Sequence, residues 1–313
     1  MSFRAYLFRR IAITVPTVLG VATLVFALIH WTPGDPVDVM LGESATPAAR
    51  DDLRVALGLD RPVAVQYAAF LAGLARGDLG VSIQTREPVA DLVGSHLPNT
   101  LMLAAAAFAF SVSVSIPLGL LAAARPRGWI DRFSAVFSLA GLAIPNFWLG
   151  PILVLCFSIY FGLLPVSGSD TPSHVILPAI TLGLAMTAFL TRMTRSAVLE
   201  SLSEDYIRTA RAIGASESRI VARHAFANAL TPIISVLGLQ AGSLLAGSVI
   251  TETIFAWPGL GRLTVEAIRA RDYPLVQGCV LVIALAYVFA NLVTDLSYAF
   301  ADPRTRVDPD DVE

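Results

Sequence analysis

The sequence predicts an all-α integral membrane protein with six transmembrane helices, a helical external insertion after the first of them, and a polar loop on the cytoplasmic side. Three observations support this prediction. Of the 313 residues, 55% are hydrophobic and 15% are charged, and the mean hydropathy is +0.69, a balance typical of membrane-embedded chains. Several apolar runs approach the roughly 20 residues that a crossing needs. The arginines are distributed unevenly between the loops, as the positive-inside rule expects.

The first predicted span covers residues 11–31. Arg4, Arg9 and Arg10 precede this apolar run, which indicates that its N-terminus lies inside. A cleaved signal peptide is the alternative interpretation of such a start. The run is long, however, and it ends in Ile-His-Trp rather than in a small-residue cleavage site. We therefore predict an uncleaved transmembrane helix.

A long polar excursion follows over residues 32–98. Thr46-Pro47 has the pattern of an N-cap followed by a first-turn proline, which predicts a helix that ends at about residue 57. Pro62 predicts the start of a second helix, which ends at Gly77. The apolar face of this second helix consists of Val63, Tyr67, Phe70 or Leu71, and Leu74. Because it has apolar surface to bury, the excursion is predicted to be a folded external subdomain.

Residues 99–124, 134–160 and 175–195 are the next three predicted spans. Pro145 lies near the middle of the third span and removes a backbone donor, so we expect a kink there. Asn146 can satisfy a carbonyl group that the kink leaves free. A binding role for Asn146 is the alternative to this structural one.

Residues 201–230 form a polar loop in an otherwise apolar chain, and they predict two short helices. Ser201 followed by Glu204 has the spacing of a capping box, and Gly214 stands where the first helix needs a left-handed stop. Between them, one apolar stripe at i, i+4, i+7 consists of Tyr206, Ala210 and Ile213. Ser216 can cap the second helix, and Pro232 suits the first turn of the next span. A solvated charged loop is the alternative interpretation of this segment.

The fifth and sixth predicted spans cover residues 231–251 and 275–299. With the N-terminus inside, 14 of the 22 arginines lie on the cytoplasmic side. Of the eight outside, five lie in the excursion, which is long enough for the positive-inside rule to discount it. Both termini are therefore predicted to be cytoplasmic. The predicted units are 1–31 with the first span, 32–98 as external insertion, 99–300 as five-helix core including the polar loop, and 301–313 as tail.

No lysine occurs in the chain, because all 22 basic residues are arginine. This excludes a Walker A lysine, a Schiff base and a Ser–Lys pair, so any ATP chemistry must lie on another chain. The four histidines are scattered, and Cys156 and Cys279 lie in apolar runs, so neither a metal site nor a disulfide framework is predicted. The net charge of −2 gives no indication of nucleic-acid binding. We expect no catalytic residue, cofactor or metal on this chain.

Residues 205–212, Asp-Tyr-Ile-Arg-Thr-Ala-Arg-Ala, resemble the cytoplasmic coupling loop of ABC-importer permeases in the form used by the dipeptide and oligopeptide branch. Arg223-His224 and Asn228-Ala229-Leu230 match the same form. In the general pattern of this loop, Glu-Ala-Ala is followed by three residues and then Gly, and here only Ala210 and Gly214 match it. The resemblance implies that the loop docks in a groove on a separate ATPase subunit. The residues implied for this contact are Glu204, Asp205, Tyr206, Arg208, Thr209, Ala210 and Gly214.

Three further stretches resemble the same family: residues 16–36 (PTVLGVATLVFALIHWTPGDP), 257–263 (WPGLGRL) and 271–274 (RDYP). The first is similar to the B-type subunit, which carries an insertion after its first helix. The resemblance covers about residues 4–306 and implies a bacterial inner-membrane heterodimer with a second permease. It also implies two ATPase subunits that hold ATP and Mg, and an external solute-binding protein. The implied contact region for that protein includes Gly34, Asp35, Trp257 and Gly259.

The resulting hypothesis is a permease subunit of an ATP-driven, binding-protein-dependent importer of di- and oligopeptides that forms half of the translocation path. A glutathione or nickel importer of the same family is an alternative. An ion-coupled secondary transporter is an alternative from a different class, but it would need membrane-buried titratable groups and internal repeats. Asn146, Gln240 and Ser243 are the candidates for lining the path. Glu252 and Asp295 receive no assigned role, although carboxylates at or inside a span are costly and usually paired.

Overall fold

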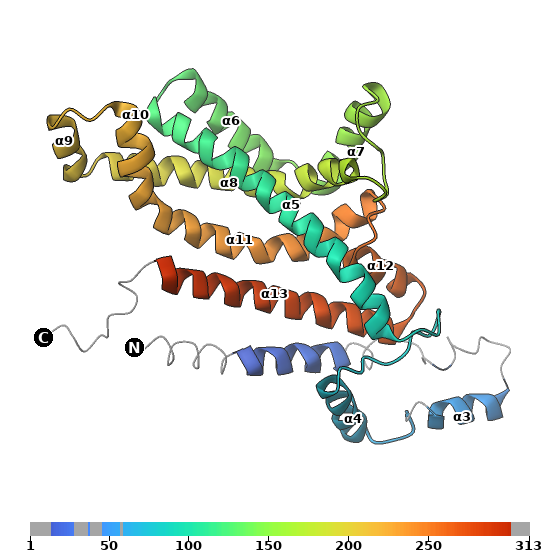
Figure 1. Ribbon diagram of the computed structural model, residues 1–313. Helices are drawn as coiled ribbons and strands as arrows, with labels where there is room; N and C mark the ends of the chain where they lie inside the picture. The colour runs from blue at the N-terminus through green and yellow to red at the C-terminus, as the bar shows by residue number, and fades with distance from the viewer. Residues whose placement is uncertain (1–13, 28–36, 38–45, 57–58, 302–313) are drawn as a thin grey trace, which may run out of the picture.

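The computed structural model describes residues 14–27, 37, 46–56 and 59–301, with the backbone alone for 49, 52, 53, 56 and 295–301. Within these ranges every regular element is a helix, apart from one isolated bridge between Val81 and Pro88. The long helices lie side by side in one elongated bundle (Figure 1). One end of the bundle carries α9 (Asp205–Ala212), and the other carries α4 (Val63–Ala75) and α12 (Leu260–Arg269).

The second span is α5 (Val89–Ala124), which begins earlier than the predicted residue 99 and shortens the predicted external insertion. Pro98, the residue just before the predicted start, lies inside this helix. Val89 and Val93 are buried with residues of α12 and α13 (Tyr273–Ala301). Their burial requires helix on the N-terminal side of the proline, and this packing outweighs the single backbone hydrogen bond that the proline cannot donate.

The third span is broken rather than kinked. α6 (Trp129–Ala143) is followed by α7 (Asn146–Leu153) and a π-helical segment, Val154–Tyr160, with a bend of 108° between the two parts. Ile144 has φ −84° and ψ 117°, the extended conformation that a residue before proline prefers. The predicted kink at Pro145 is therefore a helix end, and α7 points away from the bundle in Figure 1.

The fourth span, α8 (Ile176–Leu202), lies at the centre of the bundle and contacts α5, α6 and α11 (Phe226–Ile254). Small residues allow this close packing. A Cβ on Gly183 would lie 2.8 Å from the carbonyl oxygen of Ala107, and the Ser111 hydroxyl donates to the Gly183 carbonyl at 2.9 Å.

α8 runs past the predicted end at residue 195 and reaches Leu202. Ala197, Val198 and Ser201 are buried in this extension. The extension is therefore held by packing against the segment that follows it. A helix that ended at the membrane surface would lack this packing.

The fifth span is likewise longer than predicted. α10 (Glu217–Arg219), a π-helical segment Ile220–Ala225 and α11 form one continuous helix, Glu217–Ile254, with Pro232 inside it. The prediction that a new helix starts at Pro232 is wrong. Ala225, Ala229 and Ile233 are buried at i, i+4, i+8, a stripe that holds the chain helical through the proline.

α11 packs closely against α13. A Cβ on Gly238 would lie 1.7 Å from a Thr294 methyl carbon, and one on Gly242 would lie 2.9 Å from the Tyr287 ring. The Thr294 hydroxyl donates to the Gly238 carbonyl at 3.2 Å. These contacts are typical of helix pairs in membranes, where small residues let two backbones approach.

The two predicted external helices are present. α3 spans Pro47–Ala56, and α4 starts after Pro62 and ends before Gly77, whose φ is +77°. Tyr67 and Phe70 of α4 contact Phe26 of the first helix, with ring centroids 5.2 and 5.6 Å apart. The apolar stripe of α4 therefore packs on the first helix.

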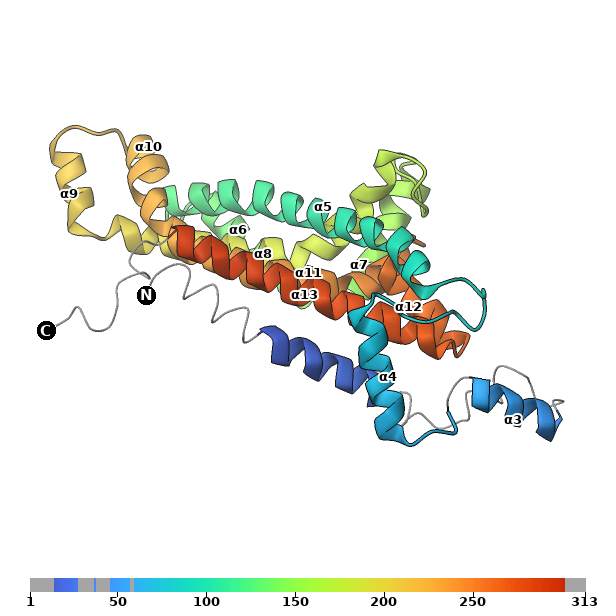
Figure 2. The same cartoon turned by 60° about the horizontal axis from the view of Figure 1, so that its bottom comes forward.

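Four described helices are long and apolar enough to cross a membrane, and a fifth crossing results if α6 and α7 count as one bent span. The first helix is described over Thr14–Ala27, fewer than the roughly 20 residues that a crossing needs. It lies beside α13 in Figure 2. The number of six spans therefore stays a prediction.

Candidate coupling segment and transport path

The polar loop folds as a short helical segment at one end of the bundle (Figure 2). α9 follows α8 after a turn, with Glu204 at its N-cap. It ends at Gly214, whose φ of +84° is the left-handed conformation that favours glycine. The Ala215 N–H donates to the Ala210 carbonyl at 3.1 Å, which closes this end of the helix. The predicted helix and its glycine stop are confirmed.

The predicted capping box is wrong. Ser201 lies in the last turn of α8, and its hydroxyl is hydrogen-bonded to the Tyr206 hydroxyl rather than to the start of α9. No side-chain cap is present on Glu204. The spacing was right for a capping box, but the extension of α8 places Ser201 inside a helix.

The inner face of α9 belongs to the buried core of this chain. Ile207 is fully buried and Ala210 is 6% exposed, in one cluster with Val198 of α8 and with Ile220 and Ala225 of the following segment. This core ties α9 to the ends of α8 and α11. The segment is therefore a fixed extension of both helices, because any displacement of α9 would disrupt packing shared with them.

The predicted apolar stripe is only partly correct. Ala210 lies on the buried face, but Ile213 is 80% exposed and Tyr206 is 38% exposed. The buried pair is Ile207 and Ala210, which are three residues apart and so share a face. Ala210 consequently points into the core of this chain, where an outside partner could not contact it.

The outer face of α9 is charged and open to solvent. Glu204, Asp205, Arg208 and Thr209 are exposed. The Arg208–Asp205 contact is 3.1 Å long and fully at the surface, so it contributes little to stability. Arg211 pairs with Glu217 at 2.8 Å across the Gly214 turn, which links α9 to α10. The face therefore combines the exposed Ile213 with charged side chains that can exchange their surface ion pairs for pairs with a partner. This composition is suited to a protein contact.

The three predicted path residues are not brought together. Gln240 is half-buried and Ser243 exposed on α11, where the Ser243 hydroxyl donates to the Gln240 carbonyl at 2.7 Å. α7, which begins at Asn146, meets the other end of α11, because Gly150 lies against Ile254. Ile254 follows Gln240 by 14 residues, or about 21 Å along a helix.

A cavity of about 750 Å³ lies between α5, α11 and α13, but its lining is almost entirely apolar. Phe108, Leu237, Leu285 and Phe289 are typical of it, and it contains none of the predicted path residues. Such walls cannot satisfy the hydrogen bonds of a peptide backbone. The cavity is therefore not assigned to the solute.

The predicted external contacts are partly contradicted. Trp257 is 1% exposed, and its indole N–H donates to the Asn99 carbonyl at 2.9 Å. Gly259 is buried against the carboxylate of Glu252. Both residues therefore hold the α12 end of the bundle together, and their burial keeps them from contacting another protein in this conformation. Gly34 and Asp35 lie outside the described residues.

Glu252 is the centre of this buried arrangement. Its carboxylate accepts from the Thr100 hydroxyl at 2.8 Å and from the Arg262 N–H at 3.0 Å, and Thr100 accepts from the Leu260 N–H at 2.8 Å. A carboxylate at the start of α12 is favoured by the helix dipole. Glu252 of α11 and Thr100 of α5 thus cap α12 together. The sequence signals this cap only as an acid followed by a glycine-rich turn, and it gives no sign of Thr100.

A second buried acid, Asp272, was not predicted to have a role. It accepts from the Leu275 N–H at 3.2 Å, as an N-cap of α13 does, and from the Ser82 hydroxyl and the Gln84 N–H. An aspartate just before a helix is a readable N-cap signal. The side chain of Asp295 lies outside the described residues.

Comparisons with known proteins agree with this architecture. A family model described as "binding-protein-dependent transport system inner membrane component" matches residues 115–307. A second model, for the N-terminal part of such membrane components, matches residues 3–104.

Three curated relatives are similar over 96% of this chain and 98% of their own length. They are the dipeptide transport system permease protein of Escherichia coli (strain K12), at 40% identity, and the di/tripeptide transport system permease protein of Pseudomonas aeruginosa (strain UCBPP-PA14), at 42%. The third is the glutathione transport system permease protein of Escherichia coli (strain K12), at 40%.

Two solved structures share the fold. One is the MetNI methionine ABC transporter in inward-facing conformations, with a TM-score of 0.56 and 16% identity over 67% of this chain and 96% of that one. The other is an amino acid ABC transporter, with a TM-score of 0.52 and 16% identity over 67% of this chain and 94% of that one. The predicted all-α membrane fold is confirmed.

Proposed function

The chain belongs to the family of binding-protein-dependent transport system inner membrane components, and from this premise we propose that it is a permease subunit of an ATP-driven importer of di- and oligopeptides. The two peptide permeases among its relatives, similar over nearly their full length, support this solute class. In the proposed assembly, this chain forms half of the transport path and a second permease forms the other half. An external binding protein delivers the solute at the α4–α12 end.

The observation that carries this proposal is the two-sided construction of α9. Its inner face, Ile207 and Ala210, is locked into the core shared with α8 and α11, while its outer face is open. We assign the outer face to the ATPase, with Glu204, Asp205, Arg208, Thr209 and Ile213 as contact residues. Gly214 shapes the turn that presents Ile213 to the ATPase.

This construction lets a movement of the ATPase reach the membrane. A force on α9 passes through Ile207 to Val198 at the end of α8, because the two belong to the same buried cluster. α8 in turn contacts α5, α6 and α11. A movement of α9 would thus be transmitted to the centre of the bundle. ATP binding and hydrolysis fall to the partner, since this chain contains no lysine for a Walker A motif.

We place the α9 end of the bundle in the cytoplasm, with both termini on that side. The first described helix starts towards this end, and α13 ends towards it (Figures 1 and 2). The arginine distribution favours the same orientation.

Uptake of labelled solutes by cells that lack this chain tests the proposal. We expect uptake of a labelled dipeptide to be lost in those cells and restored by the wild-type chain, with unlabelled oligopeptides competing and glutathione and nickel not competing. Because a glutathione permease is as similar as the dipeptide one, glutathione is the second candidate solute. Loss of glutathione uptake with normal peptide uptake would select it instead. Uptake that stops when the proton gradient collapses at constant ATP would contradict an ATP-driven importer.

A further inference from the structure

A cavity of about 640 Å³ lies beside the start of α6 and the C-terminal half of α8. Four arginines and one aspartate line it, which gives a net charge of +3 (four positive groups and one negative group). Arg127 and Arg132 come from the α5–α6 turn and α6, and Arg192 and Arg195 come from α8. Such a concentration of positive charge next to transmembrane helices requires an explanation, because like charges repel.

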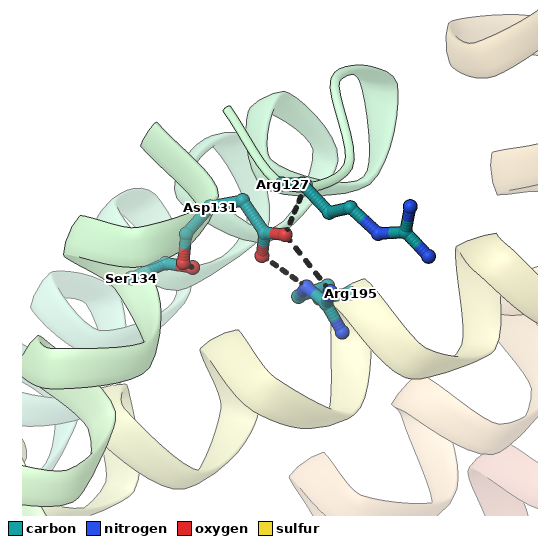
Figure 3. A network of polar contacts seen from close by, with 4 residues as sticks. All are labelled: Arg127, Asp131, Ser134 and Arg195. Carbon is teal, nitrogen blue, oxygen red and sulfur yellow. Dashed lines mark hydrogen bonds and ion pairs between the residues drawn. The ribbon is translucent and has the colours of Figure 1, made fainter. Parts of the chain in front are cut away.

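The single acid in the cavity is already fully engaged. Asp131 is 7% exposed and binds Arg195 through two contacts of 2.5 and 3.0 Å (Figure 3). Its second oxygen also accepts from the Arg127 N–H at 2.7 Å. This bond holds the Arg127 backbone at φ +64°, and the Arg127 side chain extends away from the pair in Figure 3. Asp131 therefore neutralises Arg195 alone.

The guanidinium groups of Arg127, Arg132 and Arg192 have no hydrogen-bond or ion-pair partner among the described residues. Deeper in the same cavity, Ser138 is 3% exposed, and its buried hydroxyl has no partner in the described part of the chain either. A buried hydroxyl without a partner is costly. Three free cations and one free donor therefore face the same space.

The lining changes in character along α6. Arg132 lies near the start of the helix, Ser138 about 9 Å further along its axis, and Leu142 about 15 Å along it, at 1.5 Å per residue. Leu139 and Leu142 are 74% and 47% exposed, so the deep wall of the cavity continues into an open apolar surface. The order is cation, hydroxyl donor, hydrocarbon. A free inorganic anion would use only the first of these.

We propose that this cavity binds an anionic phospholipid of the leaflet on the α9 side. Its phosphate lies among Arg127, Arg132 and Arg192, because guanidinium groups bind phosphate through two parallel hydrogen bonds. The Ser138 hydroxyl donates to an ester carbonyl of the lipid, and an acyl chain covers Leu139 and Leu142. Basic pockets between helices on the cytoplasmic side are typical lipid headgroup sites. The inference depends on a membrane location but not on the identity of the solute.

The test is a lipid titration of the purified full-length chain in detergent, followed by native mass spectrometry. The probes are phosphatidylglycerol, zwitterionic phosphatidylcholine and glycerophosphoglycerol, which has the headgroup without acyl chains. We expect tight binding of phosphatidylglycerol only. Each of Arg127→Gln, Arg132→Gln and Arg192→Gln should weaken it about fivefold, and the triple variant about 100-fold. Ser138→Ala should weaken it less and leave the preference for an anionic headgroup.

Two controls separate a lost site from a lost fold. Asp131 and Arg195 stay unchanged, because their pair joins α6 to α8. Arg208→Gln removes an exposed arginine at the same end of the bundle, outside the cavity, and should bind phosphatidylglycerol as the wild type does. The triple variant should elute as the wild type does in gel filtration.

Three results would overturn the proposal. Equal binding of phosphatidylglycerol and phosphatidylcholine would remove the role of charge. Binding of glycerophosphoglycerol as tight as that of the lipid would make the cavity a site for a free anion. Unchanged lipid binding by the triple variant, together with loss of the co-purifying second permease, would assign the cavity to the subunit interface. Uptake of dipeptide, measured separately, decides the proposed function independently of these results.

Discussion

Ile213→Asp is expected to abolish dipeptide uptake and release the ATPase subunits, while the permease stays folded in the membrane. Ile213 is 80% exposed at the end of α9, so its replacement removes almost no contact within this chain. Substitutions at such surface positions usually change stability by no more than about 0.5 kcal/mol. In the proposed docking, however, the new carboxylate would be buried without a partner in the ATPase groove, at a cost of several kcal/mol. We therefore expect ATPase binding to weaken by more than about 100-fold, measured by co-purification alongside uptake.

The matched control is Ile268→Asp, the same substitution at an exposed isoleucine of α12, at the opposite end of the bundle. It should leave ATPase association unchanged. Ile207→Asp is a second comparison, because Ile207 is fully buried in the permease itself and its loss should lower the amount of folded permease. Normal uptake by Ile213→Asp would mean that the outer face of α9 is only solvated.

Gly259→Ala is expected to destabilise the α12 end of the permease severely. A Cβ at this position would lie 2.4 Å from the carboxyl carbon of Glu252 and about as close to both of its oxygens. The carboxylate cannot move away without losing its bonds to Thr100 and to the Arg262 N–H. Overpacking of this kind costs about 1–3 kcal/mol, and the lost hydrogen bonds add to that. Thermal unfolding of the detergent-solubilised chain measures the effect.

Gly94→Ala adds the same methyl group to α5 where no atom lies within 4 Å of it. It should be neutral or stabilising, because alanine is favoured over glycine in a helix. In a chain that already carries Glu252→Ala, Gly259→Ala should cost much less, since the methyl group then meets no carboxylate. Equal costs of Gly259→Ala in both backgrounds would contradict the assignment of Glu252 as its steric partner.

Local signals in the sequence predicted helix ends well where the chain is exposed. Pro47, Pro62, Gly77 and Gly214 all act as expected. Each depends on the φ angle of one residue, which the residue type restricts without help from the rest of the fold.

Prolines in the apolar runs could not be interpreted in this way. Pro98 and Pro232 lie inside helices because buried stripes continue on both sides of them, whereas Pro145 ends a helix between exposed neighbours such as Leu142 and Phe147. The chemistry of the proline is the same in all three cases. The packing partner decides the outcome, and a single sequence does not reveal that partner.

The candidate site shows the same division. Its position at residues 201–230 could be predicted, because a polar segment stands there between two apolar runs of the sequence. The sequence did not reveal which face of α9 is buried. Tyr206 with Ile213 and Ile207 with Ala210 are both plausible apolar stripes until the core at the end of α8 is known. The WPGLG stretch was expected, from the family resemblance, to contact an external protein. It is buried because Glu252, a few residues earlier in the chain, needs the N–H groups at the start of α12.

Site-directed cross-linking in the assembled importer tests the central claim, that the outer face of α9 docks on the ATPase. Cys156 and Cys279 would first be replaced by alanine, since both are free thiols. Arg208→Cys, on the outer face of α9, and Ser169→Cys, at an exposed position in the loop before α8, then carry a thiol-reactive photo-cross-linker. We predict a cross-link between the permease and an ATPase subunit from Arg208→Cys and none from Ser169→Cys. A photo-cross-linker at Arg208→Cys that reacts only with solvent or lipid, or labelling of that position by an impermeant reagent from outside the cell, would contradict the account.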